Sequence, residues 1–204
     1  MKIYDSIGPN PKMVRMFAAE KDFKFSETET VDIMAGANRQ EPYLAKNPAG
    51  GMPAVELDEG LIIAETIAIC ELIEEKKPSP VLIGSTAAER AETRMWLRRV
   101  EWKIIQPLTD SFRNGPGIQL FQSRFRTDAS VSPFFAAVAQ DGYEWLDAQL
   151  AGRTTIVPGR FTLADVALYA IAEFGVSVGQ GIDPALKNVS TWFDAVKERP
   201  SAQA

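Results

Sequence analysis

Three short polar segments have residue types that could bind an anion or an amino acid. The first, from Asp5 to Pro11, has the sequence of a turn between a strand and a helix. In this turn Asn10 is predicted to cap the helix and Pro11 to take its first position. Capping alone would explain these residues. Free backbone N–H groups at a helix start can also stabilise an anion, including a thiolate, so both interpretations stay open.

The second segment, from Asn47 to Val55, is a glycine-rich approach to Pro53, which opens a predicted strand. Proline is unremarkable at the first residue of a strand. If the bond between Met52 and Pro53 is cis, the backbone N–H and C=O of Met52 turn outward and can pair with an extended peptide. The segment is therefore either a plain strand start or a peptide-binding edge.

The third segment is the dipeptide Glu65-Thr66, at the start of a predicted helix. Acidic and hydroxyl residues are common there because they cap the helix and interact favourably with its dipole. A carboxylate beside a hydroxyl at a helix N-terminus also suits the ammonium and carboxylate of an α-amino acid. The pair therefore fits a zwitterionic ligand as well as a simple cap.

The elements that must position these segments follow from the hydrophobic periodicity. The first part of the chain predicts a β-α-β unit, a polar or helical excursion, a hairpin around residues 58–60 and a helix over 65–76. The second strand of the unit is placed at Phe23 and Phe25, which alternate with polar residues. Residues 78–86 are rich in Pro, Gly and Ser and are expected to link a first domain, 1–77, to a second, 87–204.

The second domain is expected to be helical throughout. Its predicted helices cover residues 87–112, with a kink at Pro107, then 134–150, 163–174 and 189–198. Thr162 and Asp165 have the spacing of a capping box at the start of one of them. The fold class is therefore an α/β domain followed by an all-α bundle.

The composition excludes several kinds of chemistry. The chain has no histidine and one cysteine, Cys70, so Ser-His-Asp catalysis, histidine-ligated metals, zinc ribbons and internal disulfides are ruled out. Cys70 repeats with apolar residues on its helix and is expected in the core. A net charge of −5 disfavours nucleic acid, and no apolar run is long enough for a membrane span. We see no secretory leader and therefore expect a cytoplasmic protein. We also expect no bound metal, because histidine is absent and there is only one cysteine.

In order and content, the second and third segments resemble the N-terminal domain of cytosolic glutathione transferases. In that family, an NPxGxxPxL-like motif is followed, after a hairpin, by the motif Glu-Ser-x-Ala-Ile. The corresponding residues in this chain are 47–55 and 65–69. The stretch from Phe161 to Ala167 is similar to the family's Phe-Ser/Thr-x-Ala-Asp segment. The resemblance implies a thioredoxin-like domain of order βαβ-α-ββα, a helical-bundle domain and a homodimer. The sequence looks closest to atypical microbial and fungal branches of this family, which lack an evident Ser or Cys catalytic residue.

The resemblance also implies a glutathione site. Met52, before a cis Pro53, would pair its backbone with the cysteine of glutathione, and Glu65 with Thr66 would hold the γ-glutamyl end. Asn38 and Arg39 match the positions that hold the glycine carboxylate, and Arg39 suits a carboxylate better. Glutathione would serve as a co-substrate.

The residue that activates the thiol is where this sequence departs from the common classes. Asn10 stands at the position of the Ser or Cys of other classes, and Ser6 is another candidate. Tyr4 lies near the Tyr-type position, but we assign it to core packing. A water is a further alternative for this role.

The resemblance implies that a small hydrophobic electrophile is held by residues of both domains. The candidates are Ile7, Gly8, Trp102, Gln106 and Arg113. The predicted activity is transfer of alkyl or aryl groups to glutathione, typical of detoxification. Two alternatives stay open: a glutathione-dependent disulfide reductase or peroxidase, and a non-catalytic binding or regulatory protein.

Overall fold

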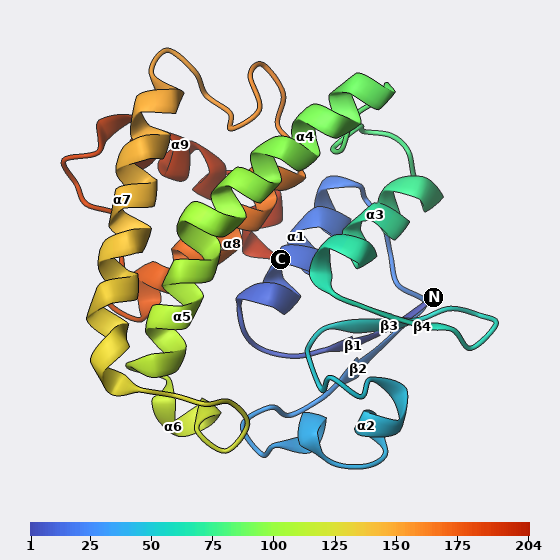
Figure 1. Ribbon diagram of the computed structural model, residues 1–204. Coiled ribbons are helices and arrows are strands. Elements are labelled where there is room, and N and C mark those ends of the chain that lie inside the picture. The colour runs from blue at the N-terminus through green and yellow to red at the C-terminus, as the bar shows by residue number, and fades with distance from the viewer. The chain divides into compact units, whose positions relative to one another are not determined.

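The computed structural model describes residues 1–204, which form two compact units (Figure 1). The first unit contains residues 1–82 and 200–204, and the second contains residues 83–199. The division falls within the stretch 78–86 that the sequence marks as a linker. The last five residues differ from the expectation, because they belong to the first unit and not to the helical one. There Ser201 and Ala202 are buried, and the Ser201 hydroxyl donates to the Glu20 carboxylate.

A four-stranded sheet of order β2-β1-β3-β4 organises the first unit. β1 pairs with β2 in parallel and with β3 antiparallel, and β3 pairs antiparallel with β4. This is the mixed sheet expected of the β-α-β unit and the hairpin. The strands are β1 (Lys2–Asp5), β2 (Glu27–Thr30), β3 (Ala54–Glu56) and β4 (Ile62–Ala64).

The predicted position of the second strand was wrong. β2 lies at Glu27–Thr30, and Phe23 and Phe25 precede it, their rings packed edge to face with centroids 5.4 Å apart. β2 is an edge strand whose four residues are all exposed, so it shows no apolar alternation. Parallel pairing with β1 holds it in place, together with ion pairs from Lys2 to Glu27 and Glu29 at 2.7 and 2.8 Å.

Helices α1 and α3 of the first unit pack together and supply about half of its buried hydrophobic residues. Phe17 of α1 and Ile69, Cys70 and Ile73 of α3 are fully buried, which confirms the expectation for Cys70. The helical segments of this unit are α1 (Pro9–Glu20), a 3₁₀ turn (Ala37–Arg39), α2 (Tyr43–Lys46), α3 (Thr66–Lys76) and a C-terminal 3₁₀ turn (Pro200–Gln203).

A buried ion pair holds the residues that follow α3 against the first unit. Lys21 is fully buried, and its ammonium lies 2.6 Å from the Glu74 carboxylate and also donates to the Pro80 carbonyl. The other oxygen of Glu74 accepts from the Leu82 backbone N–H at 3.0 Å. The hydrogen bonds to Pro80 and Leu82 therefore tie residues 80–82 to the first unit, and they give each charge of the buried pair a second partner.

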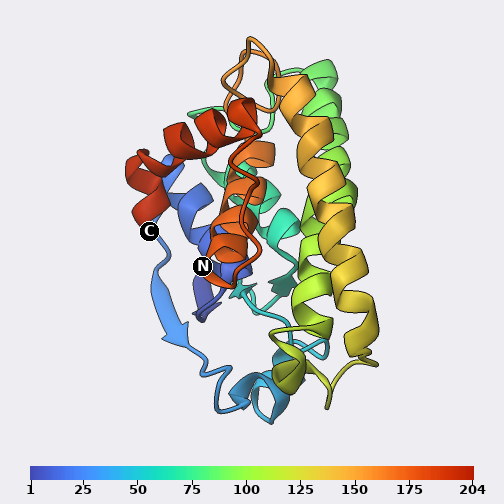
Figure 2. The ribbon, with the colours of Figure 1, turned by 90° about the vertical axis from the view of Figure 1, so that its left-hand side faces the viewer.

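The second unit is helical, as predicted. Two views show α7 running along α4 and α5 (Figures 1 and 2), and α8 is buried along most of its length. None of its helices is long and apolar enough to cross a membrane. The helices are α4 (Ala87–Val100), a π-helical turn (Glu101–Ile105), α5 (Gln106–Asn114), α6 (Ile118–Phe121), α7 (Ser132–Leu150), α8 (Leu163–Ser177) and α9 (Lys187–Lys197).

The irregularity expected at Pro107 takes the form of the π-helical turn just before it. Pro107 has no N–H to donate to the carbonyl of Lys103, four residues earlier. Gly142 of α7 passes close to that carbonyl: a Cβ on Gly142 would lie 2.1 Å from the Lys103 oxygen. The absence of a side chain at Gly142 therefore lets α7 approach the backbone of the turn.

The predicted capping box at α8 is confirmed. Thr162 accepts from the Ala164 N–H, and the fully buried Asp165 carboxylate accepts from the Thr162 N–H at 2.9 Å. Asp165 also accepts from the Ile156 N–H at 2.9 Å and from the Trp192 indole N–H at 3.0 Å. Burial raises the pKa of Asp165 to about 6, against these hydrogen bonds, which favour the ionised form. This carboxylate therefore joins α8, α9 and the loop before α8.

Candidate functional site

The register of the sheet brings the predicted glutathione-site segments to one end of the first unit. Tyr4 opposes Ala54, and Ala54 opposes Ala64, in antiparallel pairs. The residues that follow β1, those that precede β3 and those that follow β4 must therefore lie at the same end of the sheet. These are the start of α1, Met52 and Glu65. Segments about 40 and 55 residues from the first are thus neighbours in space.

The start of α1 differs from the prediction in its cap. The helix begins at Pro9, so Asn10 is its second residue, and Gly8 is the N-cap with φ 114° and ψ 171°. That φ favours glycine. No side chain caps the helix, and Asn10 is exposed.

Two prolines leave few backbone donors at this helix start. Pro9 and Pro11 have no N–H, and the Lys12 N–H bonds to the Gly8 carbonyl at 3.2 Å. Of the first three helical residues, only Asn10 can offer a backbone N–H outward. Its side-chain amide stands on the same residue, so both donors come from one position.

Ser6 and Tyr4 both direct their hydroxyl protons to other groups. Ser6 is buried, and its hydroxyl donates to the Val31 carbonyl at 2.6 Å. Tyr4 is 1% exposed, and its hydroxyl donates to the Glu56 carboxylate. Burial, together with that hydrogen bond, raises the pKa of Tyr4. Neither hydroxyl has a proton to spare for a ligand in this arrangement.

Two side chains hold the loop before β3 through the carbonyl of Gly51. The Gly51 carbonyl accepts from the Tyr43 hydroxyl at 2.7 Å and from the Asn47 amide at 3.0 Å. The bond between Met52 and Pro53 is cis. The backbone N–H and C=O of Met52 make no hydrogen bond within the chain, so both are available to a partner. Sequence reasoning missed the role of Tyr43, because nothing in its spacing relates it to the loop.

Asn38 and Arg39 support the same loop. The buried Asn38 amide donates to the Gly50 carbonyl at 2.7 Å, and Arg39 donates through Nη1 to the Ala49 carbonyl at 2.9 Å. Gly50 has φ 60°, and a Cβ there would lie 2.8 Å from Arg39 Nη1. Both residues predicted to touch the glycine carboxylate of glutathione therefore also shape the path of the chain into Met52.

Glu65 has a strained backbone at the start of α3. Its φ is 71° and its ψ is 121°, and the only other non-glycine residue with positive φ is Asp22. Aspartate is among the residues that tolerate such φ values, whereas a Glu in this region stores strain. Glu65 is exposed, Thr66 is half-buried, and no side chain caps α3. Strain of this kind clusters at functional sites.

The remaining candidates are divided between the two units. Ile7 and Gly8 belong to the first, and Ile7 is 62% exposed. In the second, Trp102 is 63% exposed and lies within the π-helical turn, an irregularity that is frequent at functional sites. Gln106 donates to Asp110 at 2.9 Å. The Arg113 guanidinium lies over the Phe125 ring, 5.2 Å from its centroid.

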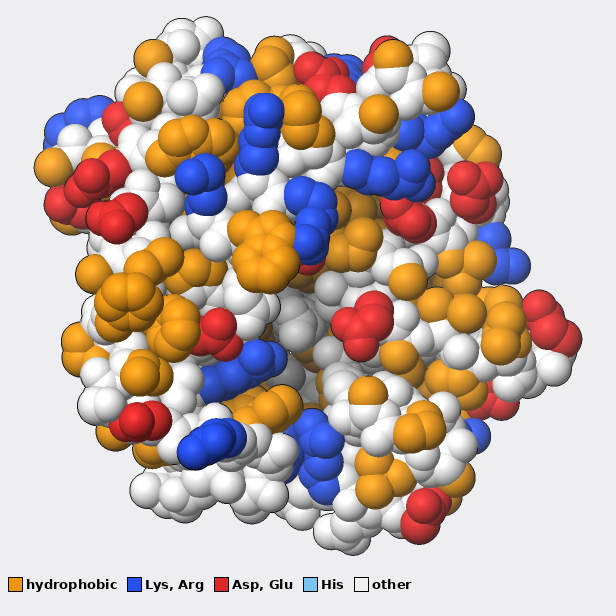
Figure 3. Space-filling view, viewed as in Figure 1, with side chains coloured by type: hydrophobic (Ala, Val, Ile, Leu, Met, Phe, Trp, Pro, Cys, Tyr) orange, Lys and Arg blue, Asp and Glu red, His pale blue; other side chains and the backbone are white.

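No three potential acidic, Cys or His ligands lie together as a metal site. On the face drawn in Figure 3, Lys and Arg side chains are interspersed with Asp and Glu. Charge of one sign is therefore not concentrated on that face.

Comparison with known proteins identifies the family. Residues 1–75 match the family model "Glutathione S-transferase, N-terminal domain", and residues 140–200 match "Glutathione S-transferase, C-terminal domain". Glutathione S-transferase F10 of Arabidopsis thaliana is 30% identical over 203 residues, covering 98% of this chain and 93% of that protein. Glutathione S-transferase 2 of Saccharomyces cerevisiae is 28% identical over 214 residues, covering 100% and 88%.

The crystal structure of Gtt2 from Saccharomyces cerevisiae has the same fold. It superposes with a TM-score of 0.89 at 28% identity, covering 100% of this chain and 99% of that one. The yeast relatives agree with the resemblance to fungal branches seen in the sequence. The chain belongs to the glutathione S-transferase family.

Proposed function

We propose that the first unit binds glutathione and that the protein transfers its activated thiolate to small electrophiles. One observation carries the proposal: the sheet register gathers the start of α1, the backbone of Met52 and the Glu65-Thr66 pair at one end of the sheet. These supply a thiolate-stabilising position, a peptide-pairing edge and a zwitterion-binding pair.

Each part of glutathione has a matching group in this arrangement. The backbone of Met52 pairs with the cysteine of glutathione as one strand pairs with another. The Glu65 carboxylate binds the ammonium of the γ-glutamyl end, and Thr66 with the uncapped N–H groups of α3 binds its carboxylate. Arg39 has five N–H donors, only one of which is directed at Ala49, and it binds the glycine carboxylate with Asn38 beside it.

Asn10 is the residue proposed to activate the thiol. Lowering a thiol pKa from about 8.5 to about 7 requires roughly 2 kcal/mol. A hydrogen bond to a charged group contributes about 1.5–3 kcal/mol, and the helix N-terminus adds about 0.3–1 kcal/mol. Asn10 offers both an amide and a backbone N–H, whereas the hydroxyls of Ser6 and Tyr4 already donate elsewhere. Ser6 can accept a hydrogen bond but is less suited to donate one.

The electrophile is proposed to be small and largely apolar, with Ile7, Gly8, Trp102, Gln106 and Arg113 as its contacts. A homodimer in the cytoplasm is also proposed, as is typical of the family. Light scattering at micromolar concentration should give twice the monomer mass of 22.4 kDa. A species of monomer mass alone would contradict the dimer.

Calorimetry of glutathione binding tests the site. Replacing Glu65 by Ala leaves the ligand ammonium unpaired, so we expect affinity to fall. Glu65 is exposed in the free protein, and the loss should reach about 2–5 kcal/mol if the bound ligand desolvates the pair. Glu59→Ala is the matched control, because Glu59 is an exposed carboxylate in the turn between β3 and β4. Equal affinity for glutathione in the folded Glu65→Ala and Glu59→Ala variants would refute the placement.

Titration of the bound thiolate by its ultraviolet absorbance tests activation. Asn10→Ala should raise the thiol pKa by no more than about one to two units, because one charged hydrogen bond contributes about 1.5–3 kcal/mol. Tyr4→Phe should leave that pKa nearly unchanged. The reverse pattern would make Tyr4 the activating residue.

Activity assays separate transfer from the alternatives. A transferase alkylates glutathione with a test electrophile, whereas a reductase or peroxidase turns over a mixed disulfide or a hydroperoxide. Binding of glutathione with neither activity would indicate a binding protein and would contradict the proposed catalysis.

A further inference from the structure

The three backbone carbonyl groups before Met52 are each bound by a side chain of residues 38–47. The pairs are Arg39 with Ala49, Asn38 with Gly50, and both Tyr43 and Asn47 with Gly51. The N–H and C=O of Met52, which come next in the chain, make no hydrogen bond within it. The chain's own supports therefore end at the residue that the proposed function assigns to glutathione.

The Gly51 carbonyl and the Met52 N–H belong to one peptide group, which is trans. A trans peptide group is planar, and its C=O and N–H point in opposite directions. A side chain that holds the Gly51 carbonyl therefore also sets the direction of the Met52 N–H. Tyr43 and Asn47 lie on the carbonyl side, so the N–H points away from both of them.

Tyr43 is itself held in place. It is 5% exposed, and its ring packs edge to face against Tyr4, with centroids 5.9 Å apart. Both rings belong to a buried cluster with Val31 and Ala54, against which the Met52 side chain packs. Burial raises the pKa of Tyr43, so its hydroxyl keeps its proton near neutral pH and can donate it. Tyr43 is therefore a fixed donor beside a loop with two consecutive glycines, whose backbone is otherwise free to rotate.

We propose that Tyr43 is a positioning residue for glutathione binding, acting with Asn47 through the Gly51 carbonyl. The inference rests on the proposed function, in which the Met52 backbone pairs with the cysteine of glutathione. Because Tyr43 fixes the peptide group before binding, the Met52 N–H already points at the position of the cysteine carbonyl, and the ligand does not have to order it. Tyr43 gives its hydroxyl proton to Gly51 and so acts on the ligand only through the backbone.

Calorimetry of glutathione binding to Tyr43→Phe tests the proposal. The variant keeps the ring in the cluster and removes only the hydroxyl, while Asn47 still holds the Gly51 carbonyl. We expect affinity for glutathione to fall about threefold to tenfold, the scale of one hydrogen bond. The double variant Tyr43→Phe/Asn47→Ala removes both donors and should lose about thirtyfold or more.

Kinetics separate positioning from activation of the thiol. In Tyr43→Phe the KM for glutathione should rise by the same factor as the dissociation constant, whereas kcat at saturating glutathione should stay within about twofold. The pKa of the bound thiol should not change, because Asn10 is unchanged. A lower kcat or a raised thiol pKa with an unchanged KM would contradict the positioning role and indicate a role in activation.

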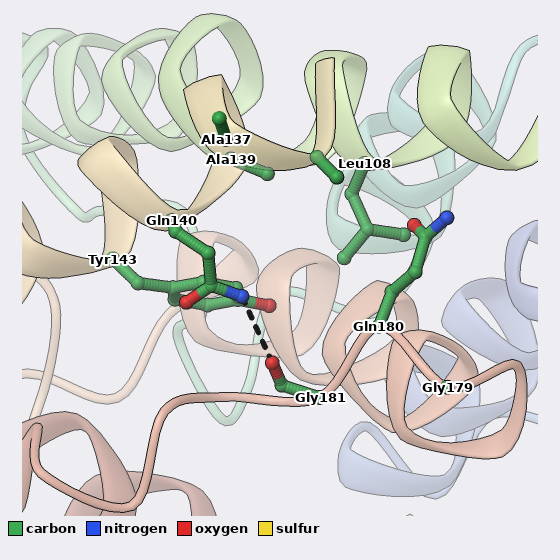
Figure 4. Close-up of a pocket in the computed structure, with 9 residues that line it drawn as sticks. Leu108, Ala137, Ala139, Gln140, Tyr143, Gly179, Gln180 and Gly181 are labelled. Carbon is green, nitrogen blue, oxygen red and sulfur yellow. Dashed lines mark hydrogen bonds between the residues drawn. The ribbon is translucent and has the colours of Figure 1, made fainter. Parts of the chain in front are cut away.

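A matched control lies in the second unit. Gln140 of α7 donates through Nε2 to the Gly181 carbonyl at 2.9 Å, so it too is a side chain that holds a glycine carbonyl of a loop (Figure 4). Gln140→Met removes this donor and keeps the length of the side chain. Its unfolding temperature should fall about as much as that of Tyr43→Phe, and its affinity for glutathione should equal that of the unmodified protein. An equal loss of glutathione affinity in both variants would assign the effect of Tyr43 to stability alone.

Nuclear magnetic resonance of the protein without ligand tests the direction of the Met52 N–H independently of glutathione. In the unmodified protein the Met52 amide should exchange rapidly with water. Its residual dipolar coupling, which reports the direction of the N–H bond, should change in the double variant. A slowly exchanging Met52 amide, an unchanged coupling, or unchanged glutathione affinity in the variants would overturn the proposal.

The two measurements distinguish this proposal from the proposed function. If the unmodified protein did not bind glutathione although the coupling changed as expected, the proposed function would fail, and the control of the Met52 N–H direction by Tyr43 would stand. If the double variant did not fold, Tyr43→Phe and Asn47→Ala, each measured singly, would decide the question, because each removes one donor from the same carbonyl.

Discussion

Replacing Glu65 by Gly should give a more stable protein than replacing it by Ala, while both variants lose affinity for glutathione. The backbone of Glu65 lies at φ 71° and ψ 121°, in a region that suits glycine. No hydrogen bond from its side chain caps α3. The folded protein therefore carries strain at this residue without a local compensation, and the carboxylate is the feature that the proposed function requires.

The magnitude follows from two opposing terms. Relieving a residue in a sparsely populated φ/ψ region gains about 1–3 kcal/mol, and the greater freedom of glycine in the unfolded chain loses about 0.5–1 kcal/mol. Glu65→Ala keeps the strained φ and removes the same carboxylate, so it is the matched reference. Relative to it, Glu65→Gly should be more stable by up to about 2.5 kcal/mol, which corresponds to at most roughly 10 °C in Tm.

Urea unfolding followed by circular dichroism measures the stabilities, and calorimetry measures glutathione binding. Both variants should bind glutathione poorly, because both lack the carboxylate. If Glu65→Gly is no more stable than Glu65→Ala, the strain argument fails. If Glu65→Gly binds glutathione as tightly as the unchanged protein, the site assignment fails independently.

Three further perturbations have defined outcomes. Gly142→Ala should destabilise the protein by about 3 kcal/mol or more in urea unfolding, because its Cβ would lie 2.1 Å from the Lys103 carbonyl oxygen and backbone cannot easily yield. Asp165, with its pKa raised to about 6, binds a proton more readily in the folded than in the unfolded chain. Its contribution to the unfolding free energy should therefore fall by about 2–3 kcal/mol as pH rises from about 4 to 6, a slope that the Asp165→Asn variant should lack. Gly50→Ala should weaken glutathione binding in calorimetry, because φ is 60° and the new Cβ would lie 2.8 Å from Arg39 Nη1 and from the Asn38 carbonyl oxygen. Gly51→Ala is the control and should bind normally, because its φ is ordinary and its Cβ would be 4.0 Å from the nearest atom.

Much of the architecture could be predicted because it depends on residues that are close together in the sequence. The capping box of Thr162 and Asp165 involves only four consecutive residues, and it is present in the structure. The corresponding box of Thr86 and Glu89 at α4 has the same spacing and was missed, although the same rule would have found it. The capping-box rule therefore holds at α8 and α4, whereas the caps expected from Asn10 at α1 and from Glu65-Thr66 at α3 are absent.

Features that depend on distant residues were not predictable. β2 is held by backbone pairing to β1 and by Lys2, so its own residues have no apolar pattern, and the alternation of Phe23 and Phe25 pointed to the wrong place. The loop before β3 is held by Tyr43, whose position in the sequence gives no sign of this contact. Likewise, the contact of Gly142 with the π-helical turn depends on how α7 packs. Single-sequence reasoning finds the segments of the site but not their supports.

The start of α1 shows how two residues without functional groups can define a site. A helix normally offers several free backbone N–H groups at its first turn, so a bound thiolate could draw on more than one of them. In this chain Pro9 and Pro11 remove two, and the Lys12 N–H bonds to Gly8. Among the first three helical residues, the positive end of the helix dipole is thus presented through a single N–H, at Asn10. For the proposed thiolate, the amide side chain of that same residue supplies the second donor, which is why the charge-stabilising role is placed on Asn10 and not on the helix start as a whole.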